Sequence, residues 1–186
     1  MAVHKPKFKN IPLSAIDRII KHHIPYELSM MRLSLAAALE RGPNQFQQNL
    51  YVEGFALHCR NLIEFLKNGD ACAFNPTDFT NTSFKVDKKF IRTKLIDKIN
   101  EQISHLTDGR TEDQDEKFKP SDWQETADII ESEFSRWLQN LTPEWAEKWE
   151  QRERMGADVA ETIVVEAGAG GACSAPTFVT VRSGDT

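Results

Sequence analysis

Cysteines and long apolar runs are scarce in this chain of 186 residues, and each shortage excludes a class of protein. The three cysteines, Cys59, Cys72 and Cys173, form no C-x-x-C pair, so we expect reduced thiols in a cytoplasmic protein. No apolar run reaches the roughly 18 residues that cross a bilayer, so we expect no membrane contact. The opening MAVHKPKFKNIPL has no apolar segment after its basic residues, so we expect no secretory signal.

Patterns that bind metals or nucleotides are also missing. No two histidines lie at i and i+4, the spacing by which a helix presents zinc ligands. The adjacent pairs His22-His23 and His58-Cys59 point to different faces of a helix. The GAGG segment near the C-terminus lacks the Lys-Ser or Lys-Thr of a phosphate-binding loop. We therefore expect neither a metal ion nor another cofactor.

The charges are unevenly distributed along the chain. Residues 1–110 hold 16 Lys and Arg against 11 Asp and Glu, whereas residues 111–186 hold 7 against 17. A basic front part is able to face nucleic acid. No dense Lys/Arg cluster is present, however, so mutual attraction of the two parts within the fold is the favoured interpretation.

Helical periodicity dominates up to about residue 154 and predicts an all-α bundle of four main helices with short accessory helices. A short helix begins at a capping-box-like Ser14–Asp17 and ends near His23, because Pro25 breaks or restarts the helix. The four main helices are predicted over residues 25–41, 44–68, 87–108 and 121–141. Residues 69–86 are predicted to form a loop, and Thr142-Pro143 to begin a further short helix.

The last thirty residues differ in composition from the rest. ETIVVEA and TFVTVRS resemble two strands on either side of GAGGACSAP. A lone hairpin is marginal in water. We therefore divide the chain into a helical domain at residues 1–155 and a β-prone tail at residues 156–186, with a poorly docked tail favoured over a docked hairpin.

The stretch FALHCRNLIEFL, residues 55–66, places polar side chains among large apolar ones. On a wheel of about 100° per residue, His58 lies at the centre of an apolar stripe and Asn61 lies at its edge. Arg60 falls about 200° away, where it can pair with Glu64 one turn on. Cys59 falls about 100° off the stripe with no evident base, which argues against a nucleophile. The stripe is predicted to contain Leu50, Tyr51, Gly54, Phe55, Leu62, Phe65 and Leu66.

Each of the four main helices places an ionisable side chain on or beside its apolar stripe. These side chains are Arg32, His58, Arg92 and Glu133. A buried charge without a partner costs several kcal/mol, so we expect these groups to find one another. One interpretation is a structural ion-pair network. The other is an anion-accepting cleft, because two arginines and a histidine suit a phosphate group.

The turn at Gly42-Pro43 predicts that the helices before and after it are antiparallel. Counting from the turn places His58 level with about residue 27, which is Glu27. We therefore expect His58 to lie within reach of Glu27, or of the carbonyls that Pro25 leaves without helical donors.

Two short patterns resemble those of other proteins. H-x-R-N-L-x-E-F at His58–Phe65, followed by H-L-T-x-x-R at His105–Arg110, resembles a pattern in small bacterial proteins of no assigned activity. That resemblance covers about residues 15–150 and implies that His105 and Arg110 belong to the same site as His58.

Arg60-Asn61 resembles the start of the R-x4-6-H motif of the HEPN superfamily, whose ribonuclease members are helical bundles. The histidine of that motif is absent, because residues 65–67 are Phe, Leu and Lys. Arg18 and His23 match R-x4-H literally. The resemblance implies metal-independent RNA cleavage with a degenerate motif.

The leading hypothesis is an intracellular binding or interaction module with an interior Arg/His cluster that accepts an anion. The alternative is a HEPN-like endoribonuclease or toxin-type enzyme, with His58 as general acid–base and arginines on the scissile phosphate. The candidate catalytic residues are His58, Arg92, His105 and Arg110, and the candidate binding residues are Glu27, Arg32, Asn61 and Glu133. A second copy, another protein or RNA is the expected partner.

Overall fold

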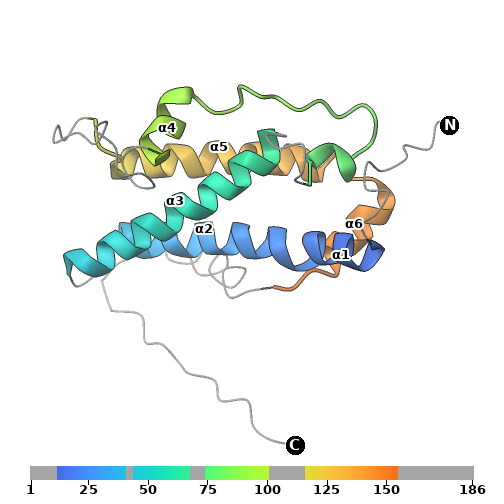
Figure 1. Cartoon of the computed structure of the whole chain (residues 1–186), viewed down its shortest axis with the longest axis horizontal. Coiled ribbons are helices and arrows are strands. Elements are labelled where there is room, and N and C mark those ends of the chain that lie inside the picture. The colour runs from blue at the N-terminus through green and yellow to red at the C-terminus, as the bar shows by residue number, and fades with distance from the viewer. Residues whose placement is uncertain (1–11, 41–43, 68–73, 101–115, 155–186) are drawn as a thin grey trace, which may run out of the picture.

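The computed structural model describes residues 12–40, 44–67, 74–100 and 116–154, and within them the chain is all-α, as predicted. The helix α3 (Gln45–Lys67) runs between α2 (Ile24–Leu39) and α5 (Pro120–Leu138) and contacts both (Figure 1). The predicted boundary at residue 156 and the tail at residues 156–186 lie outside the described residues. Among the described helices, none is both long and apolar enough to cross a membrane.

The N-terminal helix continues through Pro25, where a break or restart was predicted. α1 (Leu13–Arg18) leads into a π-helical turn, η1 (Ile19–His23), which leads into α2. Proline has no N–H, so the carbonyl of Lys21 loses its usual donor four residues on. The backbone N–H of Glu153 donates to that carbonyl at 3.0 Å. The wider turn and this distant donor together allow the helix to continue.

Close packing of α2 and α3 depends on a small residue. A Cβ atom placed on Gly54 would lie 3.1 Å from Oγ of Ser34. Nearer the end of the pair, the Gln48 side chain donates to the carbonyl of Ala38 at 2.6 Å. Gly54 thus allows α2 and α3 to approach closely at this point.

The third predicted helix begins later than residue 87. Oδ1 of Asp87 accepts the N–H of Lys89 at 2.8 Å, so Asp87 stabilises a turn instead of a helix start. Arg92 is extended, and α4 (Thr93–Asp97) follows it and leads into a π-helical turn at residues 98–100. The predicted end of this helix, beyond residue 100, is outside the described residues.

The last two helices of the described residues begin at prolines. Pro120 occupies the first turn of α5, and Oδ2 of Asp122 accepts the N–H of Lys119 at 3.1 Å. The helix α5 therefore starts one residue before the predicted start at residue 121. The helix α6 (Pro143–Glu150) begins after Thr142, as predicted.

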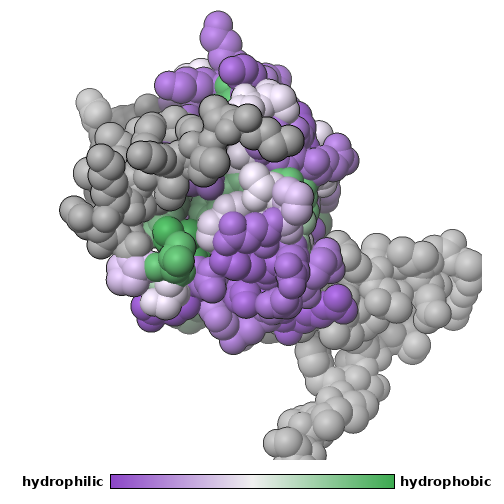
Figure 2. Space-filling model, turned by 90° about the vertical axis from the view of Figure 1, so that its right-hand side faces the viewer, coloured by the Kyte–Doolittle hydropathy of each residue, from purple (hydrophilic) through white to green (hydrophobic). Residues whose placement is uncertain are grey.

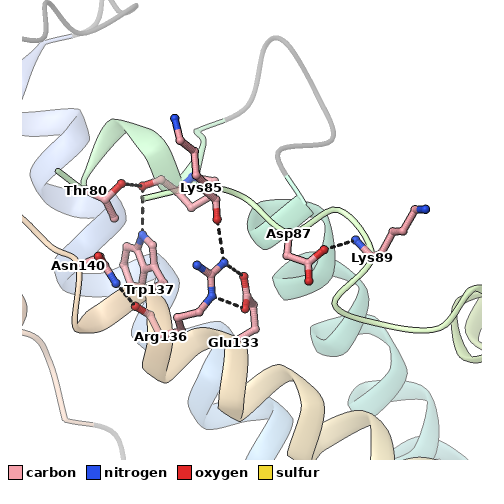
Figure 3. Close-up of polar contacts among 9 residues, drawn as sticks. Thr80, Lys85, Asp87, Lys89, Glu133, Arg136, Trp137 and Asn140 are labelled. Atoms are coloured by element: carbon pink, nitrogen blue, oxygen red, sulfur yellow. Dashed lines mark hydrogen bonds and ion pairs between the residues drawn. The ribbon is translucent and has the colours of Figure 1, made fainter. Parts of the chain in front are cut away.

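Aromatic side chains fill the core at one end of the molecule. Trp137 is fully buried, and its indole Nε1–H donates to the carbonyl of Pro76 at 3.1 Å, in the 3-10 turn η2 (Pro76–Asp78) (Figure 3). Five rings surround this tryptophan or its neighbours: Phe65, Phe79, Phe134, Trp145 and Trp149. Seen from the end that carries α1 and α6, hydrophilic residues cover most of the described surface (Figure 2).

Candidate functional site

His58 is paired with Glu27, as the helix register predicted. Nδ1 of His58 lies 2.8 Å from Oε2 of Glu27, and the Asn61 side chain donates to the same oxygen at 2.9 Å. The Tyr26 ring meets the imidazole edge to face, with 5.6 Å between centroids. The imidazole is buried, whereas Tyr26 and Asn61 face solvent.

The carboxylate of Glu27 selects the tautomer of a neutral His58 imidazole. A carboxylate accepts a hydrogen bond from Nδ1–H, so a neutral His58 carries its lone pair on Nε2. Among the described residues, none hydrogen-bonds to Nε2. This is the arrangement in which a histidine acts as a base or as a hydrogen-bond acceptor for a ligand.

Arg32 lies on a different face of α2 and pairs with α5. Its Nε donates to Oε1 of Glu131 at 2.6 Å, and its Nη2 donates to Oε2 at 2.8 Å, a bidentate pair. The pair stands at the edge of a cleft of about 140 Å³ between α2, α5 and the end of α6. The cleft is lined by Pro25, Leu28, Ser29, Arg32, Glu131, Phe134, Ser135, Leu138, Trp149, Arg152 and Glu153.

Arg152 supplies positive charge to this cleft. Its guanidinium lies 4.5 Å from the centroid of the Trp149 ring, and Nη1 donates to the Trp149 carbonyl at 3.1 Å. Among the described residues, no carboxylate pairs with Arg152. A guanidinium has five N–H donors, so several remain for a ligand. The neighbouring Glu153 carboxylate is instead directed to His22, with Oε1 2.9 Å from Nδ1.

Glu133 is buried away from both of these groups. It forms a two-pronged pair with Arg136, which also donates to the carbonyl of Lys85 at 2.9 Å (Figure 3). The pKa of Arg136 is raised, mainly because Arg136 donates hydrogen bonds to the Glu133 carboxylate, while burial lowers it. The Arg136 guanidinium also covers the ring of Phe84 at 4.5 Å. These contacts of Arg136 hold residues 84–85 against α5, and we interpret them as structural.

The remaining predicted residues do not gather at one site. Arg92 was expected on the apolar stripe, but it is exposed at the start of α4, where it pairs with Glu125. Arg60 faces outward and pairs with Glu64 at 3.2 Å, as predicted. His105 and Arg110 lie in residues 101–115, outside the described residues. The expected convergence of Arg32, His58, Arg92 and Glu133 is therefore wrong, because each pairs with a group outside this set.

The burial of two residues on α3 differs from what the helical wheel predicted. Cys59 is fully buried instead of lying off the stripe, because α3 packs against α5 as well as α2. Burial raises the pKa of its thiol well above the usual value, which disfavours a nucleophile. Leu50, expected on the buried stripe, is 49% exposed.

Sequence reasoning missed Glu131, Trp149 and Arg152, the residues that complete the cleft. Arg152 lies in QRERMG, which follows the last predicted helix. No helical period extends into this segment, so the sequence did not indicate that Arg152 faces a cleft. Among the described residues, no group of three His, Cys, Asp or Glu side chains is arranged to hold a metal ion. Comparisons with models of protein families, with curated proteins and with solved structures find no match to this chain.

Proposed function

We propose that this protein is a binding module whose cleft between α2, α5 and α6 accepts a small anion. The main support is that Arg152 lines this cleft and has no carboxylate partner among the described residues. An arginine fork suits the oxygens of a phosphate or a carboxylate.

The ligand class follows from the lining of the cleft. Phe134, Leu138 and Trp149 supply apolar surface, and Ser29 and Ser135 supply hydroxyl groups. A volume of about 140 Å³ admits a compact ligand only. The best fit is therefore a small phosphate or carboxylate with a short apolar part, held by Arg152 next to the Arg32–Glu131 pair.

The test is a titration of the protein with inorganic phosphate, followed by ¹⁵N NMR of the Trp149 indole and the Arg152 side chain. We expect saturable shifts of both signals, and at least a tenfold weaker Kd in Arg152→Gln. Arg60→Gln is the matched control, because it removes the same charge from an exposed arginine outside the cleft. Absent shifts, or equal weakening in both variants, contradict the proposal.

A second candidate is metal-independent RNA cleavage by His58. Its support is the Glu27–His58 pair in which, among the described residues, none hydrogen-bonds to Nε2, as suits a general acid–base. Anion binding is favoured over it because, among the described residues, no arginine shares a hydrogen bond or a ring contact with His58. Incubation of single-stranded RNA with excess chelator separates the two: cleavage by the wild type and none by His58→Gln would support the enzyme.

A further inference from the structure

Large apolar side chains that face solvent gather on α2 and α3. Five of them form what we call the outer face: Tyr26, Leu33, Phe46, Leu50 and Leu57, each between 38% and 70% exposed. On a helical wheel they lie on the side of the α2/α3 pair away from the residues that pack toward α5. A contiguous exposed apolar patch marks an interaction site, whereas scattered single side chains do not.

The spacing of the outer face is that of a helix-packing seam. On α2 the steps i, i+4, i+7 and i+11 join Tyr26 and Leu33 to the half-buried Met30 and Ala37. On α3 the same steps join Phe46, Leu50 and Leu57, with the exposed carboxylate of Glu53 between the last two. Alternating steps of four and three are the a/d pattern by which helices pack side by side. A helical occupant fits this pattern.

The register of α2 and α3 places large residues level with small ones. Three contacts fix it: Gln48 with Ala38, Gly54 with Ser34, and His58 with Glu27. Leu33 consequently lies level with Gly54, and Ala37 lies level with Leu50. Two of the bulky apolar residues, Leu33 and Leu50, therefore lie level with a residue of little or no side chain, whereas Leu57 lies level with Met30.

We propose that the outer face binds a second copy of this chain, so that two α2/α3 pairs form an antiparallel four-helix assembly. A two-fold axis parallel to the helices brings α2 of one copy onto α3 of the other at the same levels. Leu33 then packs against α3 of the partner subunit, between the levels of the partner's Leu50 and the partner's Leu57. Such self-complementarity is what an isologous dimer requires.

The available area agrees with a reversible dimer. The 16 residues of α2 span about 24 Å, and two helices side by side are roughly 20 Å wide, so each copy offers about 500 Å². The total of about 1,000 Å² reaches the lower limit of specific interfaces and stays below obligate ones. The outer face is a different face of α2 from the anion cleft, so neither proposal depends on the other.

The experiment is sedimentation velocity of the full chain over a series of concentrations. We expect the wild type to approach twice the 21.2 kDa chain mass and to dissociate on dilution. Leu33→Glu and Leu57→Glu should each remain monomeric at concentrations where the wild type is dimeric, with wild-type circular dichroism. Leu13→Glu is the control, because Leu13 is 69% exposed on α1, outside the outer face.

Each outcome of this experiment either supports or overturns the proposed dimer. A wild type of 21.2 kDa at every soluble concentration overturns the proposal, whatever the variants do. A dimer that survives both outer-face substitutions, or that Leu13→Glu also dissociates, overturns it as well. A dimer lost only in the two outer-face variants supports it, and Arg152→Gln should then remain dimeric.

Discussion

The Nδ1 atom of His58 lies 2.8 Å from Oε2 of Glu27, and this contact joins two helices at residues that are 31 positions apart in sequence. The carboxylate accepts a second hydrogen bond from Asn61. One partly buried acceptor therefore satisfies two donors of α3.

Removal of that acceptor should destabilise the protein. Glu27→Ala leaves Nδ1 of buried His58 without its partner, and an unsatisfied buried group costs about 1–3 kcal/mol in the free energy of unfolding. Glu27→Gln keeps one acceptor oxygen and should lose less. Urea denaturation measures both. Glu64→Ala is the control, since its exposed pair with Arg60 contributes less than about 1 kcal/mol; equal losses in Glu27→Ala and Glu64→Ala would refute the role of this contact.

Gly54 and Ser34 should be energetically coupled. Alanine is favoured over glycine inside a helix by about 1 kcal/mol, but a Cβ at residue 54 would lie 3.1 Å from the Ser34 hydroxyl. Gly54→Ala should therefore stabilise the protein more in a Ser34→Ala background than in the wild type. A double-mutant cycle by thermal unfolding gives the coupling. Additive effects would mean that the serine moves aside without cost.

The Lys98–Asp122 pair should make stability depend on pH in acid. Nζ of Lys98 donates to Oδ2 of Asp122 at 2.6 Å, and both side chains are largely buried. Burial raises the pKa of Asp122, but the hydrogen bonds from Lys98 and the Lys119 backbone outweigh it, so the pKa is lowered overall. Because the folded state binds this proton less tightly than the unfolded state, the contribution to stability is full above the unfolded pKa of about 3.9. It is lost as the pH falls from there through the folded value.

Asp122→Asn should therefore flatten the acid limb of a plot of unfolding free energy against pH. Asp128→Asn on the same helix is the control, because Asp128 is exposed and, within the described part of the chain, accepts a hydrogen bond from Gln124 alone. If both variants keep the wild-type slope, the pair does not control acid stability.

Cys59 should resist alkylation while the protein is folded. Its side chain is fully buried and burial raises the pKa of the thiol, so both access and thiolate population are low. Iodoacetamide at pH 8 followed by peptide mass spectrometry should find Cys59 labelled only after denaturant is added. Rapid labelling of the native protein would show that α3 opens easily between α2 and α5.

The sequence predicted the parts of the fold that depend on strong local signals. The period of apolar residues located α3 and α5, and Thr142-Pro143 located α6. The antiparallel count placed His58 beside Glu27, because a helix rises by a constant length per residue.

The remaining features depend on partners distant in sequence. A wheel assumes one buried side, but α3 is buried against both α2 and α5, so Cys59 was misplaced. Pro25 predicted a break, and the donor that offsets it comes from Glu153. Asp87 stabilises a local turn, and Arg92 lies before the start of α4 in an extended conformation. A helical wheel therefore does not apply to Arg92, and its predicted place on an apolar stripe was wrong. Arg152 carried no periodic pattern, although it supplies the charge of the candidate cleft.

The contact between Glu153 and Lys21 has a consequence for biosynthesis. During translation, the helix that contains Pro25 leaves the ribosome long before residue 153 is made, so the carbonyl of Lys21 is left to water. Two other hydrogen bonds also form only after this segment has been made. Lys21 donates to Gln151, 130 positions away, and Lys148 donates to Asp17, 131 positions away. Contacts of such long range form late, because loop closure precedes any gain from them. Nascent chains stalled before α6 should therefore expose the apolar surface that Trp149 covers, and chaperone binding should end when the last helix emerges.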